Sequence, residues 1–220
     1  FFGVGLAFLG ACGNPQQKAI NEVQFSLTTA AAVGRTAALA MDAMKGMPVA
    51  CTTVKTACTT YPCTAGAVTI ALGPGCPLPL GGAASGTVTV TGNWSSVDQA
   101  TLSQTFTDAQ VTAQSNKALA IASVTQVSAS RSGNTLTISY TGANAVAGAS
   151  GSALAVGASD TWSLAVDGKG TADPADDVVT VNSTSASAGG FSGVRASSIK
   201  NAVLDPTCQT NPISGSAQIT

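Results

Sequence analysis

The sequence predicts an α+β fold in which one long N-terminal helix packs on a curved antiparallel β-meander. Three observations support this prediction. Apolar residues repeat at helical spacing within residues 13–47, whereas hydroxyl and apolar residues alternate from residue 86 onward. Each strand predicted by that alternation has a single apolar face, which a helix can cover. A small β-sandwich with the helix as a stalk is the alternative architecture.

Composition restricts the function. The chain has 220 residues, only 9% of them charged, and a formal net charge of −1. Nucleic acid is therefore not an expected partner, since binding to phosphates needs clustered Lys and Arg. The sequence contains no His, which excludes the nucleophile–histidine pairs of many hydrolases. We predict a protein that is not an enzyme and that needs no cofactor.

The long helix is expected within residues 13–47. Asn14 can cap its start, Pro15 suits the first helical position, and Gly46 followed by Pro48 ends it. Apolar and small residues form a stripe at alternating steps of three and four, namely Ile20, Val23, Leu27, Ala30, Gly34, Ala37, Met41 and Met44. We expect this stripe to pack against the chain's own sheet. Self-association through residues 20–44 is the alternative.

Residues 48–82 form a predicted cysteine-rich loop region with one strand at residues 67–72. The chain has six cysteines, which in an exported protein are expected to form disulfides. A zinc site is not supported, because the sequence has neither His nor a Cys-x-x-Cys pair. The disulfide candidates, whose pairing stays open, are Cys51, Cys58, Cys63, Cys76 and Cys208. We expect two disulfides within the loop and a partner for Cys208 beyond Thr220, in a chain cut at both ends.

Residues 83–220 form the predicted antiparallel β domain. Hydroxyl and apolar residues alternate within residues 87–94, 100–106, 119–127, 135–140, 161–166 and 178–181. The Ser-Gly-Asn sequence at residues 132–134 predicts a hairpin turn between two of these strands. Residues 213–220 enter a further strand, and the domain is expected to continue beyond them.

The densest acidic stretch lies within residues 167–177. Carboxylates and glycines together can supply the flexible oxygen ligands that Ca²⁺ prefers. The four carboxylates belong to Asp167, Asp173, Asp176 and Asp177. The stretch departs from the EF-hand pattern, because Lys169 stands where a second ligand is needed. We therefore prefer a solvated hairpin loop, in which Asp and Gly serve the turn, over a calcium site.

One pattern bears on catalysis. Ser197 and Lys200 have the Ser-x-x-Lys spacing of penicillin-binding proteins and β-lactamases. The companion Ser-Asp-Asn and Lys-Thr-Gly elements are missing from the sequence, and a chain this rich in Ser is expected to match the spacing by chance. The prediction that the protein is not an enzyme therefore stands.

Residues 1–12 have the features of a targeting signal. An apolar run ends in Leu9-Gly10-Ala11-Cys12, and polar residues follow it directly. The run is too short for a membrane-spanning helix, which needs roughly 20 apolar residues, but it suits the apolar part of a signal peptide. Its ending resembles the lipobox of bacterial lipoprotein precursors. The resemblance implies a diacylglycerol on the Cys12 thiol and cleavage of the chain before that residue.

Two alternatives exist for this N-terminal segment. A type IV pilin also starts its mature chain at Phe, as Phe1 does here, but Gly5 stands where pilins usually carry Glu. The segment is otherwise a short buried strand or helix that happens to end in Cys. We prefer the lipobox, because the low charge and the remaining cysteines both suit an exported protein.

The sequence therefore predicts a lipid-anchored protein of the bacterial cell envelope, located at the outer membrane, with a structural or binding role. Its expected partner is the membrane, through the lipid on Cys12. One alternative is a periplasmic carrier of apolar molecules, because the predicted curved sheet covered by a helix resembles the lipoprotein carriers. The other is a pilin-like filament subunit that assembles through its N-terminal helix. The specific ligand stays open.

Overall fold

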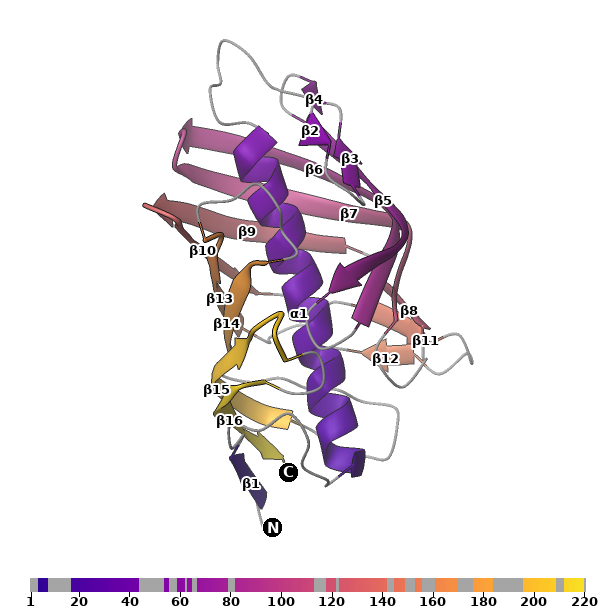
Figure 1. Cartoon of the computed structure of the whole chain (residues 1–220). Coiled ribbons are helices and arrows are strands. Elements are labelled where there is room, and N and C mark those ends of the chain that lie inside the picture. Colours follow the sequence, from indigo (N-terminus) through magenta and orange to yellow (C-terminus); the bar gives the residue numbers. More distant parts are fainter. Residues whose placement is uncertain are drawn as a thin grey trace.

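The structure is a computed structural model (Figure 1). It describes the backbone of residues 4–7, 17–43, 54–55, 59–61, 63–64, 67–78, 82–112, 118–121, 123–141, 145–148, 153–155, 161–169, 176–183, 196–208 and 212–219. Within the helix, side chains are described for residue 27 and for residues 30–43. The termini of the fold lie near each other at one end of the molecule (Figure 1).

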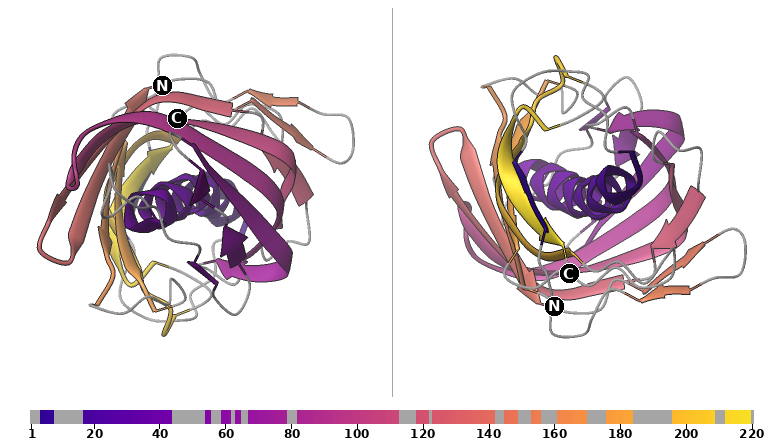
Figure 2. Two further views of the ribbon diagram at one scale, coloured as in Figure 1. Left: turned by 90° about the horizontal axis from the view of Figure 1, so that it is seen from above. Right: turned by 90° about the horizontal axis from the view of Figure 1, so that it is seen from below.

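A single antiparallel sheet dominates the described residues. Sixteen strands belong to it, and it curves around one helix, α1 (Gln17–Ala43), as the end-on views in Figure 2 show. The strands are β1 (Val4–Ala7), β2 (Val54–Lys55), β3 (Thr59–Tyr61), β4 (Cys63–Thr64), β5 (Ala67–Leu78), β6 (Gly82–Ser96), β7 (Gln99–Thr112), β8 (Ala118–Ile121), β9 (Ser123–Ser132), β10 (Thr135–Thr141), β11 (Ala145–Gly148), β12 (Ala153–Ala155), β13 (Thr161–Asp167), β14 (Val178–Ser183), β15 (Ala196–Leu204) and β16 (Ser214–Ile219).

The strands follow one continuous path with short branches. The path runs β1-β16-β15-β14-β13-β10-β9-β7-β6-β5-β3-β2. Off this path, β4 pairs with β5, β8 pairs with β7, and β11 lies between β8 and β12. The two ends of the path are therefore β1, from the start of the chain, and β2, which follows the helix.

The predicted fold class is wrong. Strands make up most of the described residues, and one helix of 27 residues is described, at Gln17–Ala43. The sheet is not a meander, because β10 pairs with β13 while β8, β11 and β12 form a branch. The β-sandwich alternative is also wrong, since the described strands form one sheet. Alternation of residue types identifies strands but not their neighbours, which depend on contacts between distant parts of the chain.

Helix α1 is enclosed by the sheet over its second half. The side chains of residues 30–41 are all buried, and Asp42 is exposed. A helix on the surface of a domain exposes one face, whereas this one contacts strands along most of the path, including β5, β7, β13 and β14. The many Ala residues in α1, together with Gly34, explain the arrangement, because small side chains let strands approach the helix from several directions.

Gly34 marks the closest approach of helix and sheet. A Cβ atom built at this position would lie 2.9 Å from Leu164 Cδ2 and 3.6 Å from Val166 Cγ2, both on β13. The core around this contact combines mostly small and apolar side chains of α1 with branched and aromatic side chains from the inner face of the sheet. Its largest fully buried members are Trp162, Leu27, Met41, Ile70, Leu102, Leu136, Ile138, Leu164 and Ile199.

Bulges with glycine at positive φ help to bend the sheet. Gly86 in β6 has a φ of 108° and Gly215 in β16 has a φ of 111°. A Cβ atom at Gly86 would lie 2.5 Å from Ala109 Cα, and one at Gly215 would lie 2.5 Å from Ala202 Cα. Neighbouring backbones can approach this closely only because glycine has no side chain. Such irregularities increase the local twist and bend of a strand, which helps the sheet to wrap around α1.

Candidate functional site

The outer face of the sheet carries a continuous row of small polar side chains, which we call the hydroxyl row. It crosses six strands in register, β6, β7, β9, β10, β13 and β14, through directly opposed residues. Its members are Asn93, Thr101, Ser128, Ser139, Ser163 and Asn182. All are exposed except Asn182, which is half-buried. The row lies on the convex side of the sheet, because the alternate residues of the same strands face α1.

A hydrogen bond at one end ties the hydroxyl row to the next strand. The backbone N–H of Asn201 on β15 donates to Oδ1 of Asn182 across 2.8 Å. Asn201 has a φ of 49°, and the register between β15 and its neighbours shifts nearby. The Asn182 side chain thus replaces the regular ladder at this irregularity. The hydrogen bond from Asn201 holds the Asn182 side chain in place, whereas the other members of the row face solvent.

The side chains of the hydroxyl row are uncharged and can both donate and accept hydrogen bonds. Each hydroxyl is both a donor and an acceptor of hydrogen bonds, and each amide carries separate donor and acceptor atoms. The six members include no ionisable side chain. Such a surface matches a ligand with its own neutral hydroxyl and carbonyl groups, and it has no field to attract an ion over distance.

The sequence indicated the residues of the hydroxyl row without locating the row. Alternation of hydroxyl and apolar residues placed Thr101, Ser139 and Ser163 on the polar faces of strands. Which hydroxyls lie opposite one another follows from the strand pairing, and the sequence does not contain that information. A one-residue shift in register would place apolar residues on this face instead.

A buried polar cluster joins α1 to the sheet. Nε2 of Gln104 on β7 donates to the carbonyl oxygen of Val33 at 3.1 Å, and its Oε1 accepts from Oγ1 of Thr36 at 2.9 Å. The Thr36 hydroxyl also lies 3.0 Å from the carbonyl oxygen of Ala32. Gln104 is fully buried. Because every polar atom of its side chain amide has a partner on the helix, the cluster fixes how α1 sits against β7.

An aromatic pair at the inner face lies beside two buried polar atoms without partners, one on Trp162 and one on Ser183. The rings of Tyr140 and Trp162 stack with centroids 6.3 Å apart, and Trp162 lies opposite Ser183 in the sheet. Both Trp162 Nε1 and Ser183 Oγ are buried and lack a hydrogen-bond partner. A buried polar atom without a partner costs stability. Trp162 and Ser183 therefore mark a place in the described core where buried polar atoms lower stability.

The acidic stretch does not assemble a metal site among the described residues. Asp167 accepts a hydrogen bond from the backbone N–H of Lys169 at 3.1 Å and pairs with its ammonium at 3.3 Å. These hydrogen bonds to Lys169, the backbone bond first, lower the pKa of Asp167 below its usual value. Within the described part of the chain, no three carboxylates or thiolates gather as potential metal ligands. Asp173 lies outside the described residues.

Asp176 and Asp177 directly precede β14. Asp177 is buried at 6% exposure, and its Oδ1 lies 3.7 Å from the position that a Cβ atom at Gly168 would occupy. The Asp177 carboxylate is therefore not solvated, unlike the side chains expected in a solvated hairpin loop. The calcium alternative stays a prediction, because Asp173 is not described.

The Ser-x-x-Lys pattern lies in a strand. Ser197 and Lys200 both belong to β15, and Lys200 is exposed opposite Ser216. The register with β16 shifts between Ala196 and Ser198, at the position of Ser197. No side-chain contact between the two residues is described.

The cysteines lie mostly outside the described side chains. Cys12, Cys51 and Cys58 lie outside the described residues, while Cys63 and Cys76 are described only as backbone in β4 and β5. Cys208 is buried and disulfide-bonded, with its partner outside the described side chains. Which cysteines pair therefore stays a prediction. The expectation that Cys208 pairs beyond Thr220 is wrong, because its disulfide is formed with another cysteine of residues 1–220.

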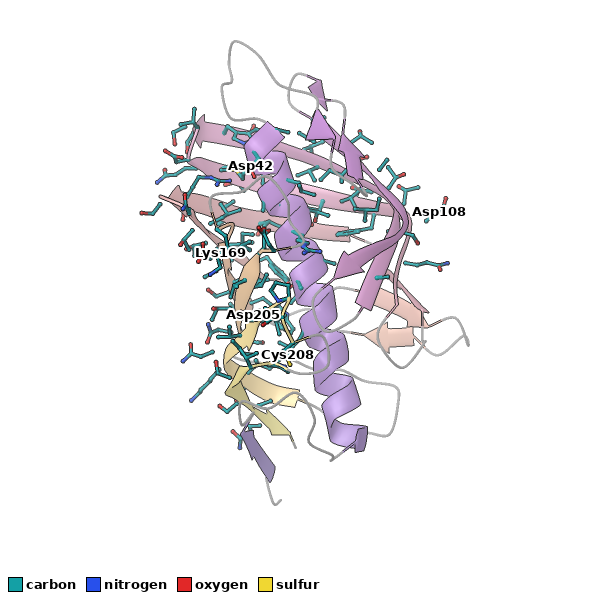
Figure 3. All side chains as sticks on the ribbon, in the orientation of Figure 1. Asp42, Asp108, Lys169, Asp205 and Cys208 are labelled. Atoms are coloured by element: carbon teal, nitrogen blue, oxygen red, sulfur yellow. The ribbon has the colours of Figure 1, made fainter. Side chains whose placement is uncertain are left out.

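A compact turn precedes Cys208. The Cys208 N–H donates to the carbonyl oxygen of Asp205 at 3.0 Å, and Figure 3 places the two residues together beside the strands β13–β16. The carboxylate of Asp205 accepts hydrogen bonds from both Oγ1 and the backbone N–H of Thr207, at 2.5 Å and 2.8 Å. These bonds, that from the hydroxyl first, lower the pKa of Asp205.

The residues before Cys12 take part in the sheet. Val4–Ala7 form β1, which pairs antiparallel with β16. The residues of the lipobox itself, including Cys12, lie outside the described residues. Among the helices that are described, none has the length and apolar character to cross a membrane.

Comparisons with known proteins do not assign the chain to a class. Neither the family models, nor the curated proteins, nor the solved structures give a match to this sequence or fold.

Proposed function

We propose that this chain is a lipid-anchored protein of the bacterial cell envelope, held at the outer membrane through Cys12, with a binding role for its outer face. The observation that carries the binding role is the hydroxyl row, an exposed and uncharged set of hydrogen-bonding side chains aligned across six strands. The anchor rests on the resemblance of Leu9-Gly10-Ala11-Cys12 to a lipobox. We do not assign catalysis to any described residue.

The position of the helix supports an anchored domain close to the membrane. Helix α1 begins at Gln17, five positions after Cys12. Even a fully extended segment of five residues spans less than about 20 Å. A domain attached in this way stays within a short distance of the lipid surface, and its outer face is presented to the components of the envelope.

A neutral polysaccharide is the ligand class that fits the hydroxyl row best. Its hydroxyl groups match donors and acceptors that lie about 4.7–4.9 Å apart from strand to strand. Each hydrogen bond exchanged with water contributes little net free energy. Useful affinity then requires many simultaneous contacts, which a row that crosses six strands can provide.

The burial of α1 favours this proposal over the two alternatives. A filament subunit needs an accessible helix stripe, but residues 30–41 are buried against the chain's own sheet. A carrier of apolar molecules needs room between helix and sheet. Around Gly34 that space is filled by Leu164 and Val166.

The anchor is tested by intact mass measurement on the protein extracted from bacterial membranes. A chain that starts at Cys12 and carries a diacyl or triacyl adduct is expected, and Cys12→Ser should abolish both the adduct and the cleavage. A membrane-associated chain that still starts at Phe1 without lipid would overturn the anchor.

The binding role is tested by co-sedimentation with insoluble neutral polysaccharides. The variant Ser139→Glu with Ser163→Glu places two charges in the middle of the hydroxyl row and should reduce binding at least tenfold. Ser214→Glu is the matched control, because Ser214 is also an exposed serine but lies in β16. Equal binding by the two variants would remove the hydroxyl row as the binding surface.

A further inference from the structure

Strand β1 covers one edge of the sheet. Four residue pairs join it to β16, with Val4 opposite Ile219 and Leu6 opposite Ala217. On its other side β16 pairs with β15. At this end of the path, β1 is therefore the strand that separates the edge of β16 from solvent.

Cleavage before Cys12 would remove this strand. Residues 4–7 precede Cys12, so a chain that starts at Cys12 has no β1. The edge of β16 then loses its four register partners and presents backbone N–H and C=O groups that can pair with another strand. Neither charge nor proline, two common protections of an edge, occurs in β16, whose sequence is Ser-Gly-Ser-Ala-Gln-Ile.

The support for β16 does not depend on β1. Gly215 lets the backbone of β16 lie so close to β15 that a Cβ atom there would be 2.5 Å from Ala202 Cα. Ala217 is buried, and the N–H of Ile213 donates to the carbonyl oxygen of Val203 at 2.9 Å. These contacts hold β16 against β15 and leave its outer edge as a preformed template.

We propose that in the processed protein the β16 edge binds an extended segment of a partner protein, which adds to the sheet in the place of β1. This inference rests on the proposed function, because it requires removal of residues 1–11. Recognition of this kind combines backbone hydrogen bonds with pockets for alternate side chains.

The sequence of β1 indicates what the partner segment should contain. The positions opposite Ala217 and Ile219 hold Leu6 and Val4, whereas small residues, Gly5 and Ala7, lie opposite Gln218 and Ser216. Because Ala217 is on the buried face, the partner strand needs branched apolar residues at alternate positions and small, uncharged residues between them.

The test uses the full chain with a protease site inserted between Leu9 and Gly10. Cutting after folding breaks the covalent link to β1, and dialysis removes the released segment. A fluorescent peptide with the sequence of residues 1–9 and a soluble lysine tail is then added, and its anisotropy is measured. The cut chain should bind the peptide at least tenfold more tightly than the uncut chain, in which the linked β1 competes at millimolar effective concentration.

Two matched controls make the result specific. A peptide with Leu6→Pro lacks a backbone donor and has a fixed φ, so it should bind at least tenfold more weakly. The uncut chain carrying Leu6→Pro should bind the unmodified peptide, because the pairing of its own β1 is weakened. If far-UV circular dichroism shows that the cut chain unfolds, this variant replaces it as the chain with an open edge.

Three results would overturn the proposal: no binding to either opened chain, equal binding to opened and closed chains, or equal binding of the proline peptide. Dimerisation of the opened chain that excludes the peptide would instead assign the edge to a second copy. The mass measurement on membrane protein is separate from all of these. The anchor can therefore fail while the edge binds, or stand while the edge does not.

Discussion

The buried contact between Gln104 and α1 should contribute measurably to stability. The substitution Gln104→Met keeps the length and approximate volume of the side chain but removes both of its hydrogen bonds to the helix. One of these is the bond from Nε2 to the carbonyl oxygen of Val33 at 3.1 Å. The other is accepted from Thr36 Oγ1 at 2.9 Å, whose single proton is shared with carbonyl oxygens of its own helix turn.

The magnitude follows from these two bonds. A buried hydrogen bond contributes about 0.5–1.5 kcal/mol net, and the shared proton of Thr36 makes the second bond a partial one. We expect Gln104→Met to lower the free energy of unfolding by about 1.5 kcal/mol. For a domain of this size that corresponds to a fall in Tm of about 3–6 °C. Guanidinium denaturation followed by tryptophan fluorescence, with the disulfides intact, provides the measurement.

A double-mutant cycle with Thr36→Val isolates the contact. Thr36→Val alone leaves the buried Oε1 of Gln104 without its donor, which costs about 1–3 kcal/mol. In the double variant neither polar group remains, so the combined loss should be smaller than the sum by about 1 kcal/mol. Losses that add to within about 0.3 kcal/mol, or a Gln104→Met protein as stable as the parent, would refute the assigned hydrogen bonds.

Three further predictions use the same denaturation measurements. Gly34→Val forces a branched side chain against Leu164, where even a Cβ atom would lie 2.9 Å from Cδ2, and should lower the free energy of unfolding by about 1–3 kcal/mol. Gly34→Ala should lower it less, since the better helix propensity of Ala offsets about 1 kcal/mol. Equal losses of stability in the two variants would contradict this packing. Ser183→Ala removes a buried hydroxyl without a partner and should leave stability unchanged or raise it by up to about 1 kcal/mol, whereas a loss above that would indicate an overlooked partner. The hydrogen bonds from Thr207 lower the pKa of Asp205 below 3.8. The stability that the Asp205 carboxylate contributes is therefore present above pH 3.8 and is lost as the pH falls through the folded pKa. Between pH 4 and pH 2, the stability of Asp205→Asn should fall less than that of the unmodified protein, and an Asp205 pKa above 3.8 by NMR would contradict this.

Local sequence patterns located elements more reliably than they located contacts. The alternation at residues 135–140 and 161–166 falls within β10 and β13, and the Ser-Gly-Asn turn lies between β9 and β10, where Gly133 has a φ of 58°. These features depend on a few neighbouring residues. The pairing of β10 with β13 skips β11 and β12, and no local pattern encodes which strand will lie next to which.

For the helix, too, the sequence pattern did not predict the contacts. A stripe of apolar residues predicted that one side of the helix would be buried, yet residues 30–41 are buried on all sides. The many alanines were compatible with either outcome, because a small side chain tolerates both solvent and close packing. The outcome depends on the curvature of the sheet, which is influenced by bulges such as those at Gly86 and Gly215.

The two candidate sites differ in how much of each could be predicted from the sequence. Thr101, Ser139 and Ser163 were recognisable as polar strand positions, but the hydroxyl row exists only through the register of several strand pairs. The β16 edge was harder to predict, because the strand that pairs with it consists of residues 4–7, more than 200 positions away in the sequence. Only the pairing shows that the segment ahead of the lipobox is also a strand of the sheet.

The enclosure of α1 determines which surfaces the protein can use for binding. Because the sheet curves around α1 and the second half of the helix is buried, the inner face of the sheet is committed to the core. Among the described elements this leaves the outer face and the two ends of the strand path. The outer face is polar and neutral, and it suits many weak contacts over a broad area. The β16 end offers directional backbone hydrogen bonds, but only after β1 has gone. If both proposals hold, processing at Cys12 would attach the domain to the membrane and open its edge in the same step, so that strand binding is confined to the anchored form.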